Sequence, residues 1–198
     1  MERTAKIVRE TGETSISLEL NIDGTGKYEV NTGLVMLDHM VSQLARHGAF
    51  DISLSSTASM DPDGHHTVED VAIALGQAFN QALGDKKGIN RMAHAIVPLD
   101  EALAMVAVDI SGRGYPVVEA DFETEVVGDL LTDLVRHFLE TLSREARINL
   151  HAQVLRGVND HHKVECLFKA LAKSLDAATR LDPRISGVLP STKGVIES

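Results

Sequence analysis

The first half of the chain contains stretches in which apolar and polar residues alternate, as they do in a half-buried β-strand. The pattern is clearest at Ser15-Ile16-Ser17-Leu18-Glu19-Leu20, and it predicts a strand over residues 7–20. A turn signal at Asp23-Gly24-Thr25-Gly26 predicts a hairpin that returns through a second strand at residues 28–30. The same alternation predicts a third strand over residues 50–58.

Helical periodicity appears between and after these strands. Residues 33–47 carry an apolar stripe at helical spacing, and Gly48 predicts the end of that helix. After a loop at residues 61–64, residues 67–83 predict a long helix that Gly84 closes. The stripe of the first helix consists of Leu37, Met40, Val41 and Leu44.

The same order of elements recurs in the second half. The pattern predicts strand structure at residues 93–110 with a turn at 98–101, a loop at 111–114, a strand at 115–122, a helix at 130–144, a strand at 146–154, a loop at 157–160 and a helix at 161–181. Residues 187–194 show no regular pattern. We therefore predict two strand–strand–helix–strand–helix half-domains, residues 1–88 and 89–198, that form one compact unit. The fold class is α+β, with helices packed on one face of a mainly antiparallel sheet.

One polar motif occurs twice, and each copy opens a predicted helix. His65-His66-Thr67-Val68-Glu69-Asp70 reappears 96 positions later as His161-His162-Lys163-Val164-Glu165. On a helix, His65 and Glu69 lie about 40° apart round the axis, so both can reach one metal ion. His66 points about 100° away from His65, toward a second ion. The repeat ends at Asp70, which has no counterpart because Cys166 stands at the matching position.

The repeat also matches His39 with His137, so each half offers three histidines and one glutamate. Two ions with four protein ligands each would use all eight side chains and keep open coordination positions. Imidazole and carboxylate without thiolate favour manganese, iron, cobalt or zinc. We expect each ion to take ligands from both halves, within one chain or between chains. The predicted ligands are His39, His65, His66, Glu69, His137, His161, His162 and Glu165.

The composition of the chain limits its possible binding partners and indicates its cellular compartment. The 198 residues carry a formal net charge of -10 with scattered Lys and Arg, which argues against nucleic acid and anionic membranes as partners. No apolar run approaches the roughly 18 residues of a membrane span, and the Met-Glu-Arg-Thr start is unlike a secretory signal. The single cysteine, Cys166, cannot form an internal disulfide, so we expect a cytoplasmic protein with Cys166 in the core.

Five motifs follow one another along nearly the whole chain. They are Leu37-Asp38-His39-Met40, Asp63-Gly64-His65-His66-Thr67-Val68-Glu69-Asp70, Asp109-Ile110-Ser111-Gly112-Arg113, His161-His162-Lys163-Val164-Glu165-Cys166-Leu167-Phe168-Lys169-Ala170 and Pro190-Ser191-Thr192-Lys193-Gly194. Together they resemble the imidazoleglycerol-phosphate dehydratases of histidine biosynthesis. The chain departs from the family pattern where Gly114 replaces a usual proline, Cys166 a usual alanine and Gly64 a common acidic residue. None of these changes removes a predicted ligand.

The resemblance implies a lyase that converts D-erythro-imidazole glycerol phosphate to imidazole acetol phosphate plus water. It also implies two manganese ions per active site and a cage-like homo-oligomer of 24 subunits, built from trimers, with active sites at subunit interfaces. Two metals on the ring nitrogens would favour imidazolate, which can expel the hydroxyl group to give a diazafulvene-like intermediate. A base would then remove the proton of the adjacent carbon, and the resulting enol would become the ketone.

The resemblance further implies roles for individual residues. Glu13 becomes a candidate acid/base, and Glu69 and Glu165 become candidate catalytic residues as well as metal ligands. Gln43 and His47 lie one and two turns beyond His39 and would face the substrate. The phosphate would be bound by Arg91, Arg113, Lys169, Ser191 and Lys193, the last two in the tail. The candidate substrate-binding residues are Glu13, His39, Gln43, His47, His65, Glu69, Arg91, Arg113, His161, Lys169, Ser191, Thr192 and Lys193.

Other interpretations use part of the same pattern. A structural metal site would use these ligands, but the absence of thiolate ligands and the surplus coordination positions argue against it. A dinuclear metallohydrolase would need a bridging aspartate, and Asp70 has no counterpart in the second copy. A fused phosphatase is not indicated, because Asn21-Ile22-Asp23-Gly24-Thr25 lacks a paired aspartate. A metal-storage cage would keep the ligands but would not need Arg113 or the Ser-Thr-Lys tail.

Overall fold

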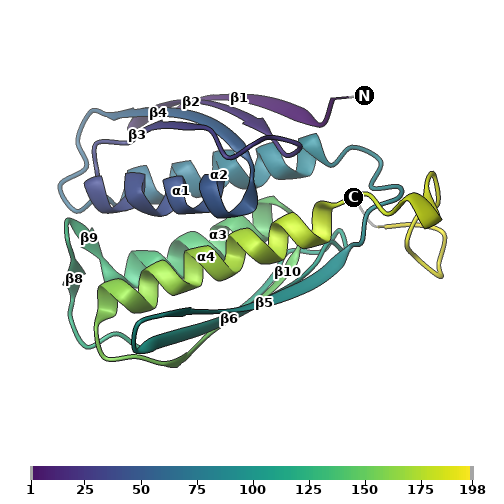
Figure 1. The fold of residues 1–198 in the computed structure, drawn as a ribbon. Helices are drawn as coiled ribbons and strands as arrows, with labels where there is room; N and C mark the ends of the chain where they lie inside the picture. The colour runs from purple at the N-terminus through teal and green to yellow at the C-terminus, as the bar shows by residue number, and fades with distance from the viewer. Residues whose placement is uncertain (1, 197–198) are drawn as a thin grey trace.

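The chain folds into four layers, in which two sheets enclose two layers of helices (Figure 1). The structure, a computed structural model, describes residues 2–196. The first sheet contains β1 (Thr4–Glu10), β2 (Thr14–Asn21), β3 (Tyr28–Asn31) and β4 (Asp51–Ala58) in the order β1-β2-β4-β3. Helices α1 (Val35–Gly48) and α2 (His65–Ala82) cover its inner face.

The second half repeats this arrangement. Its sheet contains β5 (Met92–Leu99), β6 (Ala102–Asp109), β7 (Tyr115–Glu119) and β10 (Asn149–Arg156) in the order β5-β6-β10-β7. Helices α3 (Thr132–Glu145) and α4 (Asp160–Thr179) cover its inner face. In both sheets one edge strand is parallel to its neighbour, and the other pairs are antiparallel. The predicted α+β class with mainly antiparallel strands is confirmed. The division at residues 88 and 89 stays a prediction.

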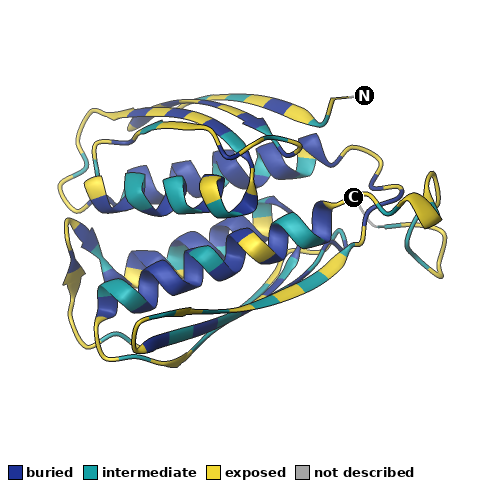
Figure 2. Ribbon diagram, viewed as in Figure 1, coloured by how far each residue is buried: buried dark blue, intermediate teal, exposed yellow. Residues whose placement is uncertain are grey.

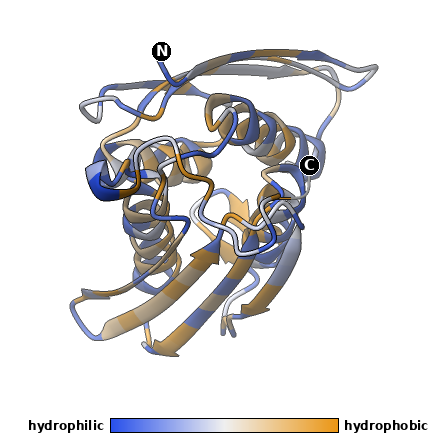
Figure 3. Ribbon diagram, turned by 90° about the vertical axis from the view of Figure 1, so that its right-hand side faces the viewer, coloured by the Kyte–Doolittle hydropathy of each residue, from blue (hydrophilic) through white to orange (hydrophobic). Residues whose placement is uncertain are grey.

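One hydrophobic core fills the space between the sheets. Helix α1 packs against α4 and α2 against α3, so each helix of one half meets a helix of the other. Alternate residues of β2 are buried against this layer, as the sequence pattern predicts. Figure 2 shows buried residues along the facing sides of the helices, and Figure 3 shows the two sheets on opposite sides of the helix layers. The pairing of helices across the halves decides which polar side chains can meet.

The start of α1 is fixed by a residue of the other half. The residue before the helix, Leu34, offers no side-chain cap. Instead, the Asp129 carboxylate accepts hydrogen bonds from the backbone N–H of Val35 (2.6 Å) and of Met36 (2.8 Å). Such a cap satisfies N–H groups that have no partner within the helix. It also fixes the turn of α1 that carries His39.

Two predictions for the first sheet are wrong. Residues 7–20 form two strands instead of one, because residues 11–13 make a tight turn between β1 and β2. The expected β2–β3 hairpin does not form, because β3 pairs in parallel with β4. Asp51, at the start of β4, accepts hydrogen bonds from Thr25 N (2.8 Å) and Lys27 N (2.9 Å). These bonds hold the connection beside β4 and away from β2.

The other elements lie close to their predicted positions. β5 and β6 form the hairpin expected around residues 98–101. Helix α2 begins at His65, two residues before the predicted start, and β7 ends at Glu119 instead of residue 122. A ribbon of β8 (Val126–Val127) and β9 (Leu130–Leu131) and a short 3-10 helix, η1 (Pro183–Ile185), have no counterpart in the prediction. Within residues 2–196, no helix is both long enough and apolar enough to cross a membrane.

Candidate active site

A cluster of two histidines and one glutamate forms where α1 meets α4. This α1–α4 cluster consists of His39 on α1 and of His161 and Glu165 on α4. The Nε2 atoms of His39 and His161 lie 3.1 Å and 3.2 Å from the same oxygen, Glu165 Oε2. The three potential ligand atoms lie within 4.8 Å of one another. Ligands about 2 Å from a common divalent ion would lie at comparable separations from one another.

A second cluster forms where α2 meets α3. This α2–α3 cluster consists of His65 and Glu69 on α2 and of His137 on α3. The His65 and His137 rings stack with centroids 4.9 Å apart. His137 Nε2 lies 3.3 Å from Glu69 Oε1, but it is buried and finds no hydrogen-bond partner in the described part of the chain. A buried imidazole nitrogen without a partner, beside a carboxylate, fits a site for a cation.

Side-chain caps fix the two helix starts that carry the histidine doublets. At α2, the Asp61 carboxylate accepts hydrogen bonds from His66 N (3.1 Å) and Thr67 N (2.8 Å). At α4, the Asn159 side chain accepts a hydrogen bond from His161 N (2.9 Å). Both caps satisfy backbone donors of a first helical turn. The doublet side chains therefore project from a fixed backbone.

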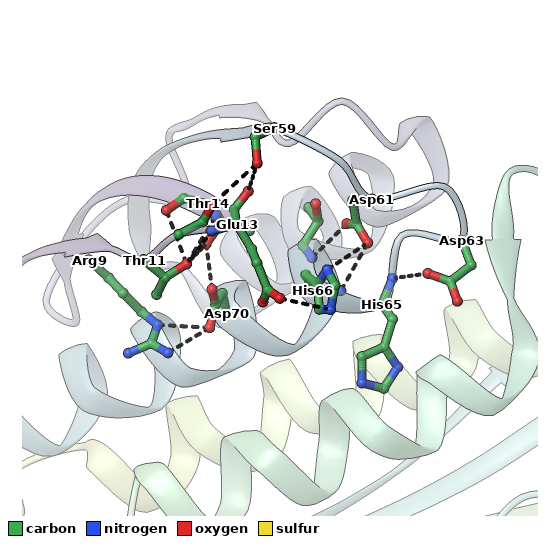
Figure 4. Close-up of polar contacts among 12 residues, drawn as sticks. Arg9, Thr11, Glu13, Thr14, Ser59, Asp61, Asp63, His65, His66 and Asp70 are labelled. Atoms are coloured by element: carbon green, nitrogen blue, oxygen red, sulfur yellow. Dashed lines mark hydrogen bonds and ion pairs between the residues drawn. The ribbon is translucent and has the colours of Figure 1, made fainter.

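The second histidine of each doublet faces away from both clusters. His66 Nε2 lies 3.5 Å from Glu13 Oε1, and its Nδ1 lies 3.6 Å from Asp61 Oδ1. Figure 4 shows His66 between these two carboxylates, whereas His65 points toward the second half. In the other half, His162 Nδ1 lies 2.8 Å from Glu101 Oε2. Within one chain, six of the eight predicted ligands gather into two clusters, and His66 and His162 lie outside them.

Glu165 is held as an anion. Burial by itself would raise the pKa of its carboxyl group, but hydrogen bonds from Lys169 and His39 outweigh that effect and hold the pKa at about 2. The Lys169 Nζ atom lies 2.6 Å from Glu165 Oε1. An anionic carboxylate beside two imidazoles is the protonation state that metal binding requires. Lys169 therefore lies beside the α1–α4 cluster and does not line the pocket formed by the tail.

Glu101 and His162 hold each other through a short polar contact. Hydrogen bonds from His162 and from the backbone of Asn159 hold the pKa of Glu101 at about 2, and the Glu101 carboxylate raises the pKa of His162. The same carboxylate accepts hydrogen bonds from Val158 N (3.2 Å) and Asn159 N (2.8 Å). Glu101 therefore fixes both the loop before α4 and the ring of His162.

The predicted substrate-facing residues of α1 extend the α1–α4 cluster along the helix. Gln43 Nε2 lies 3.5 Å from His39 Nε2. One turn further on, burial and then the neighbouring charges of Lys169 and Lys173 lower the pKa of His47. His47 is thus a neutral imidazole at pH 7. A largely apolar hollow of about 460 Å³ adjoins His39 and His161 on the side of the Asp129 cap.

The tail residues form a separate pocket of about 150 Å³. The Arg91 guanidinium donates to both oxygens of Asp109 (2.7 Å and 3.2 Å) and to the carbonyl of Pro190 (2.7 Å), and thereby holds the tail against β6. Arginine, lysine and hydroxyl groups around a small cavity suit an oxyanion such as phosphate. The pocket is lined by Arg91, Ser111, Arg113, Ser191, Thr192, Lys193, Val195 and Ile196.

The tail pocket and the α1–α4 cluster lie at opposite ends of α4. His161 and Glu165 belong to the first turns of that helix, whereas Arg91 N donates to the carbonyl of Ala178 in its last turn (2.9 Å). Thirteen residues of helix between positions 165 and 178 span about 20 Å. Figure 1 shows the tail beside the end of α4, far from its start. One chain therefore does not bring its tail pocket to its own α1–α4 cluster, and of the predicted phosphate-binding residues only Lys169 lies beside that cluster.

Glu13 lies near His66, with its side chain 58% exposed. It belongs to neither cluster, and 3.5 Å separates it from the outward-facing histidine of α2. A cavity of about 750 Å³ lies beside the strands of the first sheet, and none of the predicted site residues lines it.

Among the residues that contribute to these sites and were not predicted as site residues are Asp61, Glu101, Asp109 and Ser111. Asp61 stands in the loop just before a predicted helix, which is a capping signal. Asp109 lies near the end of a predicted strand and Ser111 in the loop after it, both within a quoted motif, but the sequence did not indicate that Asp109 pairs with Arg91. Glu101 lies in a turn, and only the folded chain brings it to His162.

Comparison with known proteins gives a consistent result. A model of the family described as imidazoleglycerol-phosphate dehydratase matches residues 32–175. The imidazoleglycerol-phosphate dehydratase of Dehalococcoides mccartyi is 59% identical over 197 residues, which cover 100% of this chain and 99% of the relative. The enzyme of the same name from Methanothermobacter thermautotrophicus is 53% identical over 194 residues, which cover 98% of this chain and 97% of the relative.

Two solved structures share the fold. The crystal structure of imidazoleglycerol-phosphate dehydratase from Staphylococcus aureus matches with a TM-score of 0.81 and 31% identity, over 90% of this chain and 99% of the other. The Pyrococcus furiosus enzyme, solved in complex with (S)-C348, matches with a TM-score of 0.81 and 34% identity, over 96% of this chain and 99% of the other.

Proposed function

This chain belongs to the imidazoleglycerol-phosphate dehydratase family of histidine-biosynthetic hydro-lyases, and from that premise we propose that it dehydrates D-erythro-imidazole glycerol phosphate at a dinuclear metal site. The product would be imidazole acetol phosphate, formed in the cytoplasm. The single observation that supports the metal site is the assembly of two clusters, each with two histidines and one glutamate, across the two halves of the chain.

The residues fit divalent transition-metal ions. The α1–α4 cluster would hold one ion and the α2–α3 cluster a second, with imidazole and carboxylate ligands that suit manganese and its neighbours. The buried, unpartnered Nε2 of His137 supports this assignment, because a bound cation would satisfy it. We propose manganese as the ion, on the basis of the family.

We further propose that the active site forms between subunits. His66 and His162 face away from both clusters, so each could reach a cluster only on a neighbouring chain. The tail pocket likewise lies about 20 Å from the α1–α4 cluster along α4. A homo-oligomer that brings the helix starts of one subunit to the tail of another would complete both sites. The family resemblance suggests 24 subunits, built from trimers.

The chain's own residues would bind the substrate at both ends. Arg113 and Lys193 would bind the phosphate through charge-assisted hydrogen bonds, while Arg91 anchors the tail that carries Lys193. Gln43 and the neutral His47 would contact the glycerol part of the substrate beside the α1–α4 cluster. When bound, the two ions would supply Lewis acidity that favours the imidazolate form of the substrate ring.

Side chains would have to carry out two proton transfers in this reaction. The leaving hydroxyl group needs a proton to depart as water, and the adjacent carbon must lose one before the enol becomes the ketone. Glu13 is the candidate for such a transfer, because it is exposed and lies next to an outward-facing histidine. Glu69 and Glu165 would serve chiefly as ligands, since the pKa of about 2 keeps Glu165 from holding a proton at pH 7.

Chelation and manganese add-back test the proposal. The purified protein would be stripped with a chelator, assayed for ketone formation from imidazole glycerol phosphate, and assayed again after stoichiometric manganese. We expect activity to disappear and to return. A metal-loaded protein that makes no ketone would instead support a metal-storage role, and hydrolysis of the phosphate would support a metallohydrolase.

A further inference from the structure

Asp70 is a buried carboxylate on α2 that belongs to neither metal cluster. Its side chain accepts hydrogen bonds from Arg9 Nε (2.8 Å) and from the Thr14 hydroxyl, and only 5% of the residue is exposed. Because Asp70 follows His66 by four residues, both side chains lie on the side of α2 that faces β1 and β2. Asp70 therefore links the helix that carries a histidine doublet to the β1–β2 turn.

That turn carries Glu13. The Thr11 hydroxyl accepts hydrogen bonds from Glu13 N (3.2 Å) and Thr14 N (3.0 Å), and Ser59 N donates to the Glu13 carbonyl (2.9 Å). Thr14 closes the turn and is itself 3% exposed. The backbone of Glu13 is thus held on both sides, while its side chain is 58% exposed and extends toward His66 (Figure 4).

In the second half, the glutamate of the corresponding turn makes different contacts. Glu101, in the β5–β6 turn, accepts hydrogen bonds from two backbone N–H groups and contacts His162 directly. Among the described residues, no backbone N–H donates to the Glu13 carboxylate, which lies 3.5 Å from His66. Cys166, at the position that matches Asp70, is buried in the core. A buried carboxylate that binds the turn, Asp70, therefore occurs only in the first half. In that half no described backbone N–H group fixes the carboxylate of the turn glutamate, Glu13.

We propose that Asp70 is a positioning residue, which acts through Thr14 and the turn at residues 11–13 to set the carboxylate of Glu13 for proton transfer. The inference rests on the proposed acid/base role of Glu13. A carboxylate on a turn has many orientations, and proton transfer requires it within hydrogen-bond reach of the reacting atom. A buried charge fixed by Arg9 makes a rigid acceptor for the Thr14 hydroxyl.

Removal of a single hydroxyl group tests the proposal, with less risk of misfolding than substitution of Asp70. In the manganese-loaded assembly, we expect Thr14→Val to lower kcat about tenfold, with KM and metal content unchanged. Thr14→Ser keeps the hydroxyl and should restore kcat. In a Glu13→Gln background, Thr14→Val should cause no further loss, because the group that it positions is already absent.

Matched variants separate the possible failures. Ser174→Ala removes another buried hydroxyl, bonded to the carbonyls of Val106 and Ala170, and should leave kcat unchanged while it lowers the melting temperature by a similar amount. If Thr14→Val lowers kcat equally in both backgrounds, or releases metal, Asp70 has a structural role only and the inference is wrong. If Glu13→Gln itself retains full kcat, the proposed role of Glu13 fails first. If Glu13→Gln is impaired but Thr14→Val is not, this inference alone fails.

Discussion

Neighbouring histidines have different surroundings, and these surroundings decide what each ring can do. His65 stacks on His137 across the two halves, whereas His66 lies between Glu13 and Asp61. Helical geometry alone separates the two side chains by about 100°. Under the proposed function, a doublet at a helix start would serve two metal sites, one within the chain and one on a neighbouring chain.

His66→Ala tests the outward-facing ligand. If His66 binds an ion of a neighbouring subunit, its loss should lower metal affinity at least about tenfold and lower turnover with it. Metal content after dialysis, measured by elemental analysis, checks this result. The control is His94→Ala, which removes an exposed histidine of β5. Metal content equal to that of the control would remove His66 from the ligand set.

Lys193→Ala tests the phosphate pocket. The loss of one charge-assisted hydrogen bond to phosphate should raise KM roughly tenfold, with metal content intact. Steady-state kinetics and elemental analysis measure the two effects. Lys87→Ala removes an exposed lysine that pairs with Asp85, and it should change neither quantity. Metal loss in Lys193→Ala would mean that the tail has a structural role.

Local periodicity was enough to pair His65 with Glu69 and His161 with Glu165, because both members of each pair lie on one helix. Comparison of the two halves then added His39 and His137 to the predicted metal ligands. The contacts of Glu101 with His162 and of Asp61 with His66 could not be predicted, because loop side chains approach a helix only in the folded chain. The backbone of Arg91, with φ of 71°, is likewise set by its tertiary partners and not by its own preference.

At the scale of elements, the β2–β3 connection shows where local signals fail. Asp23-Gly24-Thr25-Gly26 is a strong turn signal, and a turn does form there. The choice of partner strand, however, depends on Asp51, which lies 24 residues or more away and binds the connection to β4. Gly24 is required for the same reason, because a Cβ atom there would lie 2.4 Å from Asp51 N.

Asp51→Ala should destabilise the first sheet in a pH-dependent way. Burial acts to raise the pKa of Asp51, but hydrogen bonds from Thr25 and Lys27 outweigh it and hold the folded-state pKa below 3.8. The stabilisation is thus fully present above the unfolded-state value and is lost as the pH falls through the folded-state pKa. We expect a loss of about 1–2 kcal/mol at pH 6, from two backbone hydrogen bonds, that shrinks below pH 3.8.

Chemical denaturation between pH 3 and pH 7 measures this difference. Glu29→Ala removes an exposed carboxylate from the neighbouring strand β3 and serves as the control. A destabilisation by Asp51→Ala that stays constant across this range would contradict the assignment of its effect to the ionised carboxylate.

At the scale of the whole molecule, the duplicated fold assembles the α1–α4 and α2–α3 clusters but places the tail pocket at the opposite end of α4 from the first of them. Helices of the two halves pair across the core, so each cluster draws on both halves of one chain. The sequence left open whether the halves would meet within a chain, because matched motifs do not specify which copies pack together. The tail pocket lies at the far end of α4 from the α1–α4 cluster, and for this reason we propose that a second chain brings the two together.

Mixed oligomers test this arrangement directly. His161→Ala impairs the α1–α4 cluster and Lys193→Ala impairs the tail pocket, so neither variant alone should support normal turnover. If each active site combines the cluster of one subunit with the tail of another, random co-assembly should leave about a quarter of the sites with both parts intact. Co-expressed variants with different affinity tags, purified through both tags, should therefore regain activity at low substrate concentration.

Separately assembled variants mixed just before the assay are the control. If the co-assembled protein is no more active than that mixture, cluster and tail act within one chain, and the helix-end separation described above must close by a rearrangement of the tail.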